Sequence, residues 1–202
     1  MSPVEALGLE VKFAPGPVLA RPVRTAADVA ALRRPARGEI APSVMAALKI
    51  VRSELAQRQA LLGFAGSPWS IAAYLVQGRS SPGFPALRAL AVAEPQVLDA
   101  LLTRLTDLII DYVHAQFEAG ADAIQLFDTW AGILSHDAWS RIVRPHIARF
   151  LDETRGAGRP RILFVQDASH LVPGYAALPG EALAVDWRED LAALRRAVGP
   201  AK

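Results

Sequence analysis

The sequence contains no cysteine among its 202 residues, and it has only four histidines. Without cysteine there can be no disulfide, no thiolate zinc site and no cysteine nucleophile, and thiol chemistry gives no indication of the compartment. The histidines, at positions 114, 136, 146 and 170, include no His-x-x-x-His pair. Because such spacing is typical of helical metal ligands, the sequence predicts no metal site.

Other signals are absent as well. No apolar run reaches the roughly 18 residues that a membrane-spanning helix needs, and the first residues lack the features of a signal peptide. The net charge of +2 is too small to indicate a nucleic-acid-binding surface. The chain also has no Gly-x-Ser-x-Gly elbow, no Walker loop and no Rossmann glycine fingerprint. We therefore expect a soluble cytoplasmic protein that binds neither nucleic acid nor membrane.

What the chain has is a regular alternation of apolar runs and amphipathic segments, in a composition that is 52% hydrophobic. Strands are expected at residues 60–64, 121–127, 161–165 and 182–185. Helices are expected at residues 25–32, 42–59, 69–77, 84–91, 94–119, 135–154 and 190–198, with a short irregular helix over 169–178. Residues 1–24 are expected to form an extended lead-in segment with a short β segment at 9–13. Apolar strands that alternate with helices are typical of a parallel sheet covered by helices, so we predict an α/β fold.

The most informative stretch runs from Gly63 to Gly78. A short apolar run is followed by a turn in which Ser67 is placed to cap a helix and Pro68 to begin it. The helix carries Tyr74, whose phenol can reach back over the strand end. Ligands of α/β proteins bind on this side of the sheet. Considered without relatives, aromatic residues at this spacing more often pack helices than form a site.

A second informative stretch covers residues 125–132. Asp128 and Thr129 follow directly after a predicted strand, where a barrel places its chemistry. Asp128 is equally explained as a helix cap or as one partner of a loop ion pair. Asp186, after the last strand, is in the same position, and we favour a capping role for it.

These stretches resemble the internal signatures of the uroporphyrinogen decarboxylase family. The first carries the family's Gly-Phe-x-x-x-Pro-aromatic turn and its tyrosine, with Ser70 in place of the usual threonine. The second carries its Leu-Phe-Asp-Thr loop, and residues 185–187 resemble its Leu-Asp-Trp segment. Residues 166–170 depart from the glycine-containing segment that the family usually has there.

The resemblance covers nearly the whole sequence but not the whole family domain, which is a single (β/α)8 barrel. It implies that residues 1–202 form one partial TIM barrel domain of about four βα units. The family's catalytic aspartate and arginines would lie upstream of Met1, and a later histidine downstream of Lys202. We therefore expect a chain that is truncated at both ends.

The family reaction is the decarboxylation of the four acetate side chains of uroporphyrinogen III, which gives coproporphyrinogen III in heme biosynthesis. The pyrrole ring serves as the electron sink, so the resemblance implies no cofactor. It also implies a catalytic role for Tyr74, contact of Thr129 with a substrate carboxylate, and an apolar cleft wall made by Phe64 and Phe127. Asp128 is predicted to bind substrate in the same loop. The tetrapyrrole is the expected partner.

Truncation leaves alternatives to an active enzyme. The chain alone is expected to be weakly active or inactive, and it could instead be a non-catalytic half barrel that binds a porphyrinogen or docks on a partner. A zinc methyltransferase of the same superfamily is disfavoured because that metal site uses cysteine. Two unpaired barrel edges would pair with other chains, so we expect a homo-oligomer or pairing through these edges.

Overall fold

A four-stranded parallel sheet in the order β3-β4-β5-β6 forms the centre of the computed structural model. The structure describes residues 2–13, 16–56, 59–156 and 158–199. A separate antiparallel hairpin pairs β1 with β2. The strands are β1 Val11–Phe13, β2 Pro17–Leu19, β3 Leu62–Gly66, β4 Ala123–Asp128, β5 Arg161–Val165 and β6 Ala182–Val185.

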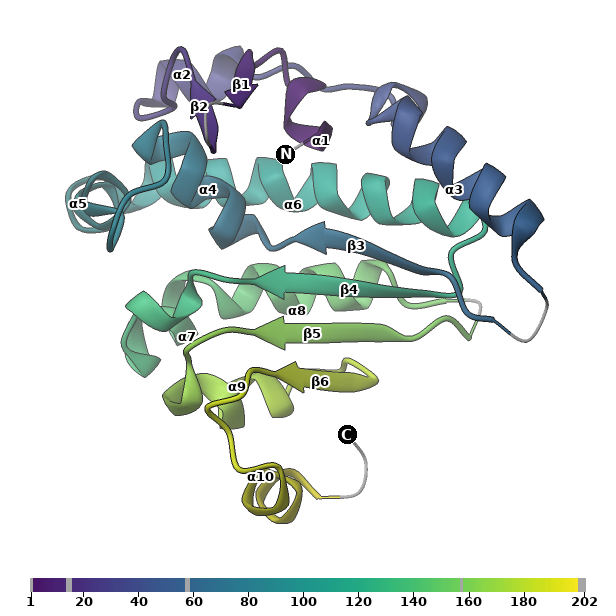
Figure 1. Ribbon diagram of the computed structural model, residues 1–202. Helices are drawn as coiled ribbons and strands as arrows, with labels where there is room; N and C mark the ends of the chain where they lie inside the picture. The colour runs from purple at the N-terminus through teal and green to yellow at the C-terminus, as the bar shows by residue number, and fades with distance from the viewer. Residues whose placement is uncertain (1, 14–15, 57–58, 157, 200–202) are drawn as a thin grey trace.

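Helices follow each strand of the sheet, and three more precede β3. The helices are α1 Ser2–Glu5, α2 Ala26–Ala31, α3 Pro42–Glu54, α4 Pro68–Gln77, α5 Pro85–Ala93, α6 Pro95–Glu118, α7 His136–Ile142, α8 Arg144–Glu153, α9 Val172–Ala176 and α10 Leu191–Val198, with 3-10 turns η1 Arg37–Glu39, η2 Ala131–Ile133 and η3 Ser169–Leu171. All four arrows of the sheet point the same way, and the turns toward α4, α7 and α9 lie beyond the arrowheads (Figure 1). The predicted alternation of parallel strands and helices is confirmed.

The start and end of α4 follow from three residues that the sequence already singles out. The Ser67 hydroxyl accepts the backbone N–H of Ser70, and Pro68 occupies the first turn. Gly78 ends the helix with a φ of 85°, a conformation that glycine adopts without the steric penalty of a Cβ atom. The sequence therefore fixes where the strand end turns into the helix that carries Tyr74.

Two predicted helices differ from those observed. The helix predicted over residues 135–154 is two helices, α7 and α8, which meet at Val143. Pro145 has no backbone N–H to donate to the preceding turn, and its ring clashes with the carbonyl four residues earlier. The helix that begins at Pro42 ends at Glu54 rather than near Gln59. Residues 57–58 of that prediction lie outside the described residues.

The lead-in of residues 1–24 is not extended throughout. Residues 2–5 form the helical turn α1, in which Pro3 and Val4 are buried. The β1–β2 hairpin and the residues that follow it are held against the end of α4. There the N–H groups of Leu19 and Val23 donate to Gly78 O at 2.8 Å and to Leu75 O at 2.9 Å. Met1 and residues 14–15 of this segment lie outside the described residues.

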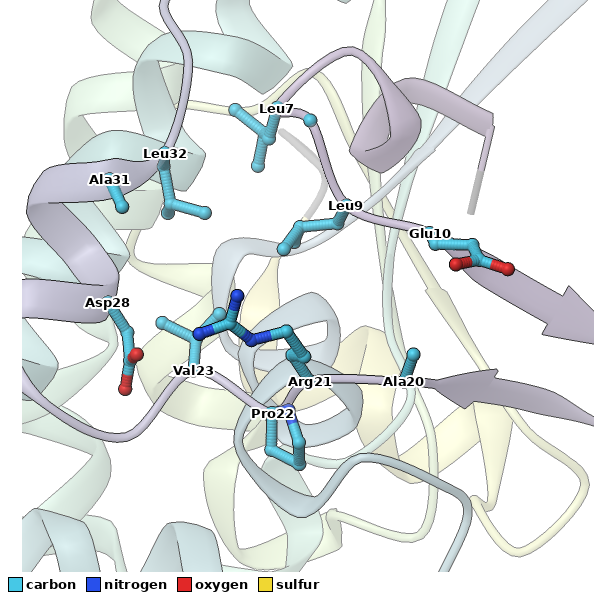
Figure 2. A pocket seen from close by; sticks show the side chains of 11 residues that line it. Leu7, Leu9, Glu10, Ala20, Arg21, Pro22, Val23, Asp28, Ala31 and Leu32 are labelled. Carbon is cyan, nitrogen blue, oxygen red and sulfur yellow. The ribbon is translucent and has the colours of Figure 1, made fainter.

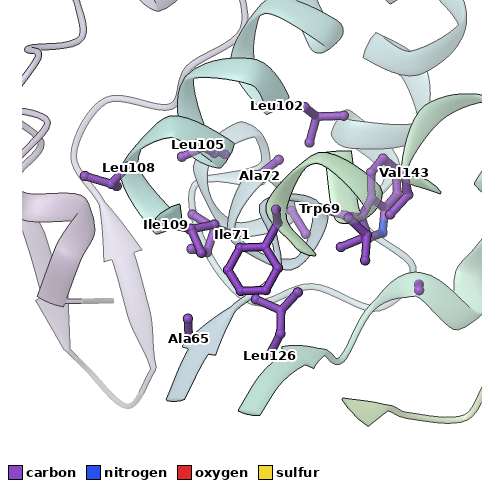
Figure 3. Close-up of a cluster of buried hydrophobic side chains, with 14 of the residues drawn as sticks. Ala65, Trp69, Ile71, Ala72, Leu102, Leu105, Leu108, Ile109, Leu126 and Val143 are labelled. Atoms are coloured by element: carbon purple, nitrogen blue, oxygen red, sulfur yellow. The ribbon is translucent and has the colours of Figure 1, made fainter. Parts of the chain in front are cut away.

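The core lies between the sheet and the helices α4 and α6. Figure 3 shows the buried cluster in which Trp69 and Ile71 of α4 and Leu105 and Ile109 of α6 gather over Leu126 of β4. Side chains alternate along β4, so one face of the strand is buried against helices and the other is only half buried. The half-buried face is the interior face of the partial barrel, and it leads to the candidate site.

Candidate functional site

A cavity of about 430 Å³ opens at the carboxyl ends of β3 and β4. Its lining includes four residues predicted from the sequence: Phe64, Tyr74, Phe127 and Thr129. The rest of the lining comes from α1, β2, α3, α4, α6, the end of β3 and Trp130 in the loop after β4. None of the described residues that line it carries a charge. The structure therefore brings four separately predicted residues to one largely apolar cavity.

An apolar strip forms the floor beside this cavity. Phe64 is 61% exposed, and its ring stands edge-on to that of Phe127 at a centroid distance of 6.3 Å. Phe164, on β5, continues the strip with its centroid 5.2 Å from that of Phe127. Phe164 is not among the residues predicted from the sequence, although the strand register places it directly beside Phe127. Three exposed or half-exposed rings on three strands therefore form one continuous apolar surface.

Tyr74 is held by aromatic packing at the side of the cavity. Its ring centroid lies 5.6 Å from that of Phe84 and 6.2 Å from that of Trp130, both in edge-on contact. Phe84 and Trp130 are themselves 4.8 Å apart. Tyr74 therefore packs against other aromatic rings and also lines the cavity.

Asp128 does not line the cavity. Its carboxylate is turned into the interior, where the residue is 1% exposed. It accepts hydrogen bonds from the hydroxyls of Ser67 at 2.8 Å, Ser70 at 3.0 Å and Tyr175 at 2.5 Å. Burial raises the pKa of the Asp128 carboxyl above its ordinary value, and the hydrogen bonds from Tyr175, Ser67 and Ser70 oppose that rise. The loop ion pair considered for Asp128 is not observed among the described residues.

Asp186 does not cap the helix that follows it, so the capping prediction is wrong. Asp190 caps α10, since its carboxylate accepts the N–H groups of Ala192 and Ala193. Asp186 instead accepts the backbone N–H of Asp167 at 2.7 Å and that of Arg188 at 2.9 Å. These backbone hydrogen bonds, with the charge of Arg188, lower its pKa. Asp186 thus connects the loops that follow β5 and β6.

A second cavity, of about 390 Å³, lies among residues 7–10, 20–23 and 28–32 and shares no lining residue with the first. Figure 2 shows its Arg21 guanidinium reaching between Asp28 and Leu9. The Asp28 carboxylate is already engaged, because it accepts the hydroxyl of Thr25 and the backbone N–H groups of Arg24 and Thr25, just before α2. No predicted site residue lines this cavity.

The histidines contact the rest of the protein separately. His114 Nε2 lies 3.1 Å from Glu153 O, and His170 Nε2 lies 2.7 Å from Leu134 O. Within the described ranges, no three histidine, aspartate or glutamate side chains gather closely enough to hold a metal ion. No helix of the described chain is both long and apolar enough to cross a membrane.

Comparison with solved structures supports the fold. A methyltransferase from Methanosarcina mazei superposes with a TM-score of 0.76 at 20% sequence identity, over 98% of this chain and 59% of that one. The chain is thus an α/β protein with the fold of a partial TIM barrel, as predicted. At this level of identity the likeness shows the fold alone.

Several proteins are more similar to this chain in sequence than that structure is. The uroporphyrinogen decarboxylase of Citrifermentans bemidjiense is 39% identical over 199 residues, which are 98% of this chain and 59% of that protein. The uroporphyrinogen decarboxylase of Geobacter sulfurreducens is 38% identical over 98% of this chain and 58% of its own length. The chain therefore spans a little under three fifths of the length of these relatives. The family model described as uroporphyrinogen decarboxylase (URO-D) matches residues 1–202, and the chain belongs to that family.

Proposed function

We propose that this chain forms the substrate pocket of a uroporphyrinogen decarboxylase-type carboxy-lyase. The observation that carries the proposal is that Phe64, Tyr74, Phe127 and Thr129 line one cavity at the carboxyl ends of parallel strands. The reaction would be the removal of CO2 from the four acetate side chains of uroporphyrinogen III to give coproporphyrinogen III. The pyrrole ring accepts a proton on carbon and then the electron pair of the broken C–C bond. The resulting exocyclic methylene is protonated and the ring carbon loses its added proton, which gives the methyl group without a cofactor.

Each of these side chains suits one part of such a ligand. The rings of Phe64 and Phe127 would pack against the apolar macrocycle, where burial of aromatic surface favours binding. The Thr129 hydroxyl can donate a hydrogen bond to a substrate carboxylate. The Tyr74 phenol, at the side of the cavity, can donate to or accept from a polar group at the reacting ring.

The same lining explains why we propose little or no turnover by this chain alone. Decarboxylation needs an acid that delivers a proton to the ring carbon and cations that hold the carboxylates. Among the described residues, the cavity lining has neither an acid nor a cation. The carboxylate of Asp128 is buried and bound by three hydroxyls.

A second candidate follows from this uncharged lining. The chain could be a non-catalytic module that binds a porphyrinogen or docks on a partner that supplies the missing charges. A zinc methyltransferase has less support, because this sequence offers no cysteine ligand. The two leading candidates share a ligand and differ in turnover.

One experiment separates them. The purified chain is incubated anaerobically with uroporphyrinogen III, and products are separated by carboxylate number, while binding of oxidised uroporphyrin is followed by fluorescence quenching. We expect binding without measurable turnover. We also expect a loss of affinity of about tenfold in Phe127→Ala, equivalent to about 1.4 kcal/mol of lost apolar contact.

Controls make the result specific. Val92→Ala removes an apolar side chain that is 85% exposed on α5 and should leave binding unchanged. Turnover that falls in Tyr74→Phe would mean that the chain is a complete catalyst, which would contradict the weak activity proposed here. If the folded wild-type chain does not bind uroporphyrin, the proposed pocket is wrong.

A further inference from the structure

A buried hydrogen-bond network joins three loops at the carboxyl end of the sheet. Ser67 caps α4 after β3, Ser70 lies in the first turn of α4, Asp128 ends β4, and Tyr175 lies on α9 after β5. All three hydroxyls donate to the Asp128 carboxylate, two to Oδ1 and Tyr175 to Oδ2. One acidic side chain at the end of β4 thereby links the start of α4 to α9.

The network continues from Asp128 to the backbone beside Thr129. Ser70 Oγ, which donates to Asp128, accepts the backbone N–H of Trp130 at 3.2 Å. The Trp130 carbonyl in turn accepts the indole N–H of Trp69 at 3.0 Å. Thr129 therefore lies between two anchored residues. Asp128 is held through its side chain, and Trp130 is held through its backbone N–H and its carbonyl.

The chemistry of a carboxylate suits this task. An ionised carboxylate only accepts hydrogen bonds, so the Ser70 hydroxyl must donate toward Asp128 and present a lone pair to the Trp130 N–H. An amide in the same place could donate to Ser70 as well as accept from it, and the direction of the hydroxyl would no longer be fixed. Burying an acid without a cation is unfavourable, which makes its presence hard to explain by stability alone.

We propose that Asp128 is a positioning residue, which holds Thr129 and Trp130 against the cavity through Ser70 and is itself oriented by Tyr175. It does not touch the ligand, and this replaces the substrate contact predicted for it from the sequence. The inference rests on the proposed function only in naming a tetrapyrrole as the ligand. Its structural part, the fixing of the loop after β4, stands on the hydrogen bonds alone.

The test compares Asp128→Asn and Tyr175→Phe with a matched control. Thr106→Val removes another fully buried hydroxyl, which bonds Leu102 O at 2.7 Å on α6 away from the cavity. Amide exchange at Trp130 is measured by NMR, together with the melting temperature and the affinity for uroporphyrin. We expect Trp130 exchange to rise and affinity to fall by about tenfold in Asp128→Asn and about threefold in Tyr175→Phe, in line with hydrogen bonds to a charged group.

The control separates positioning from general loss of stability. Thr106→Val should lower the melting temperature without a specific change at Trp130 or in affinity. If Trp130 exchange and uroporphyrin affinity are the same in Asp128→Asn as in Thr106→Val, the inference is overturned. If the Asn variant does not fold, Ser70→Ala should reproduce its effect and Ser70→Thr, which keeps the hydroxyl, should restore it. A wild-type chain that binds no porphyrin would contradict the proposed function, and Trp130 exchange would still decide the positioning role.

Discussion

β3 and β6 are the two outer strands of the same sheet, but the helices that follow them differ greatly in burial. Of the ten residues of α4, which follows β3, eight are buried. None of the eight residues of α10, which follows β6, is buried, and all four residues of β6 are only half buried. Trp187, between them, is 84% exposed and contacts the Arg188 guanidinium at 4.8 Å.

The difference shows where the stability of this chain resides. The β3 side combines the hairpin, α4 and the long helix α6 in one core, whereas the β6 side has few apolar contacts. Segments with few buried contacts open more easily than the core does. The candidate cavity lies on the better packed side, and its geometry should therefore persist when the β6 side opens.

The largest test of this contrast uses two leucines. Leu75→Ala in α4 removes a fully buried side chain and should lower the free energy of unfolding by about 3 kcal/mol through lost burial and a cavity. Leu194→Ala in α10 removes a half-buried side chain and should lower it by less than about 1 kcal/mol. Urea denaturation measures both. Equal losses would contradict the proposed difference between the two sides.

An ion pair is one of the polar connections on the less buried side. Arg161 of β5 is 3% exposed, and its Nε donates to Glu181 Oε2 at 2.9 Å. Its guanidinium also contacts the second oxygen of Glu181 and the carbonyls of Leu151 and Pro179. Removing one partner of a fully buried pair costs about 3–5 kcal/mol. Because Glu181 is partly exposed, we expect Glu181→Ala to lose a smaller amount, about 2 kcal/mol.

The stability that the Arg161–Glu181 ion pair contributes should depend on pH, and the direction follows from the pKa of Glu181. Burial alone would raise the pKa of Glu181, but hydrogen bonds from Arg161 and its charge outweigh burial and lower the pKa below 4.5. A carboxyl with a lowered folded-state pKa stabilises the protein above its unfolded pKa, and that stabilisation is lost as the pH falls through the folded pKa. The stability difference between wild type and Glu181→Gln should therefore shrink below about pH 4.5. A difference that stays constant down to pH 3 would show that the charge of Glu181 contributes nothing.

Much of the fold could be predicted because local signals agree with one another. Residues 161–165 and 182–185 are strands with the predicted bounds, and Ser67 and Gly78 cap α4 as expected. The division of residues 135–154 into two helices was also readable, since Pro145 lies inside the predicted helix. The helical turn of residues 2–5 was not, because a segment of four residues gains its stability from packing of Pro3 and Val4 rather than from propensity.

The site was predictable only in part. Phe64, Tyr74, Phe127 and Thr129 lie together because parallel strands end at the same edge of a sheet. Alternation along β4 could have shown that Asp128 points away from the face that carries Phe127. Its contact with Tyr175, 47 residues away, depends on tertiary packing and has no local signal.

The β3 edge has one further feature that the β6 edge lacks among the described residues. Ser67 N–H donates to Phe127 O, and Leu61 O accepts from Asp122, so these residues of the β3 segment face β4. Successive residues of a strand turn their backbone N–H and C=O groups to opposite sides. Phe64 is an odd number of residues from both Leu61 and Ser67, so its backbone groups face the open edge. Both are bound there by the Gln116 side chain, which accepts the Phe64 N–H and donates to its carbonyl, each at 3.0 Å. Gly63 permits this approach, since a Cβ atom there would lie 2.5 Å from Gln116 Oε1.

We therefore expect Gln116 to limit strand pairing at the β3 edge. Gln116→Leu keeps a similar volume but leaves both Phe64 groups unpaired, and it should cost about 1 kcal/mol. It should also make self-association stronger, as measured by sedimentation velocity over a range of concentrations. Gln116→Glu keeps the acceptor but buries a carboxylate beside the Phe64 carbonyl, so it should lower stability more than Gln116→Leu does.

The matching change at the other edge completes the comparison. Glu181 N–H donates to Arg161 O, so Ala184, three residues later, faces the open side of β6 with its backbone groups. Ala184→Lys places a charge on that edge and should weaken any association that the wild-type chain shows there. If Gln116→Leu associates no more than wild type while Ala184→Lys abolishes association, pairing occurs through β6 alone. If neither variant changes association, the edges of this sheet are not where copies of the chain meet.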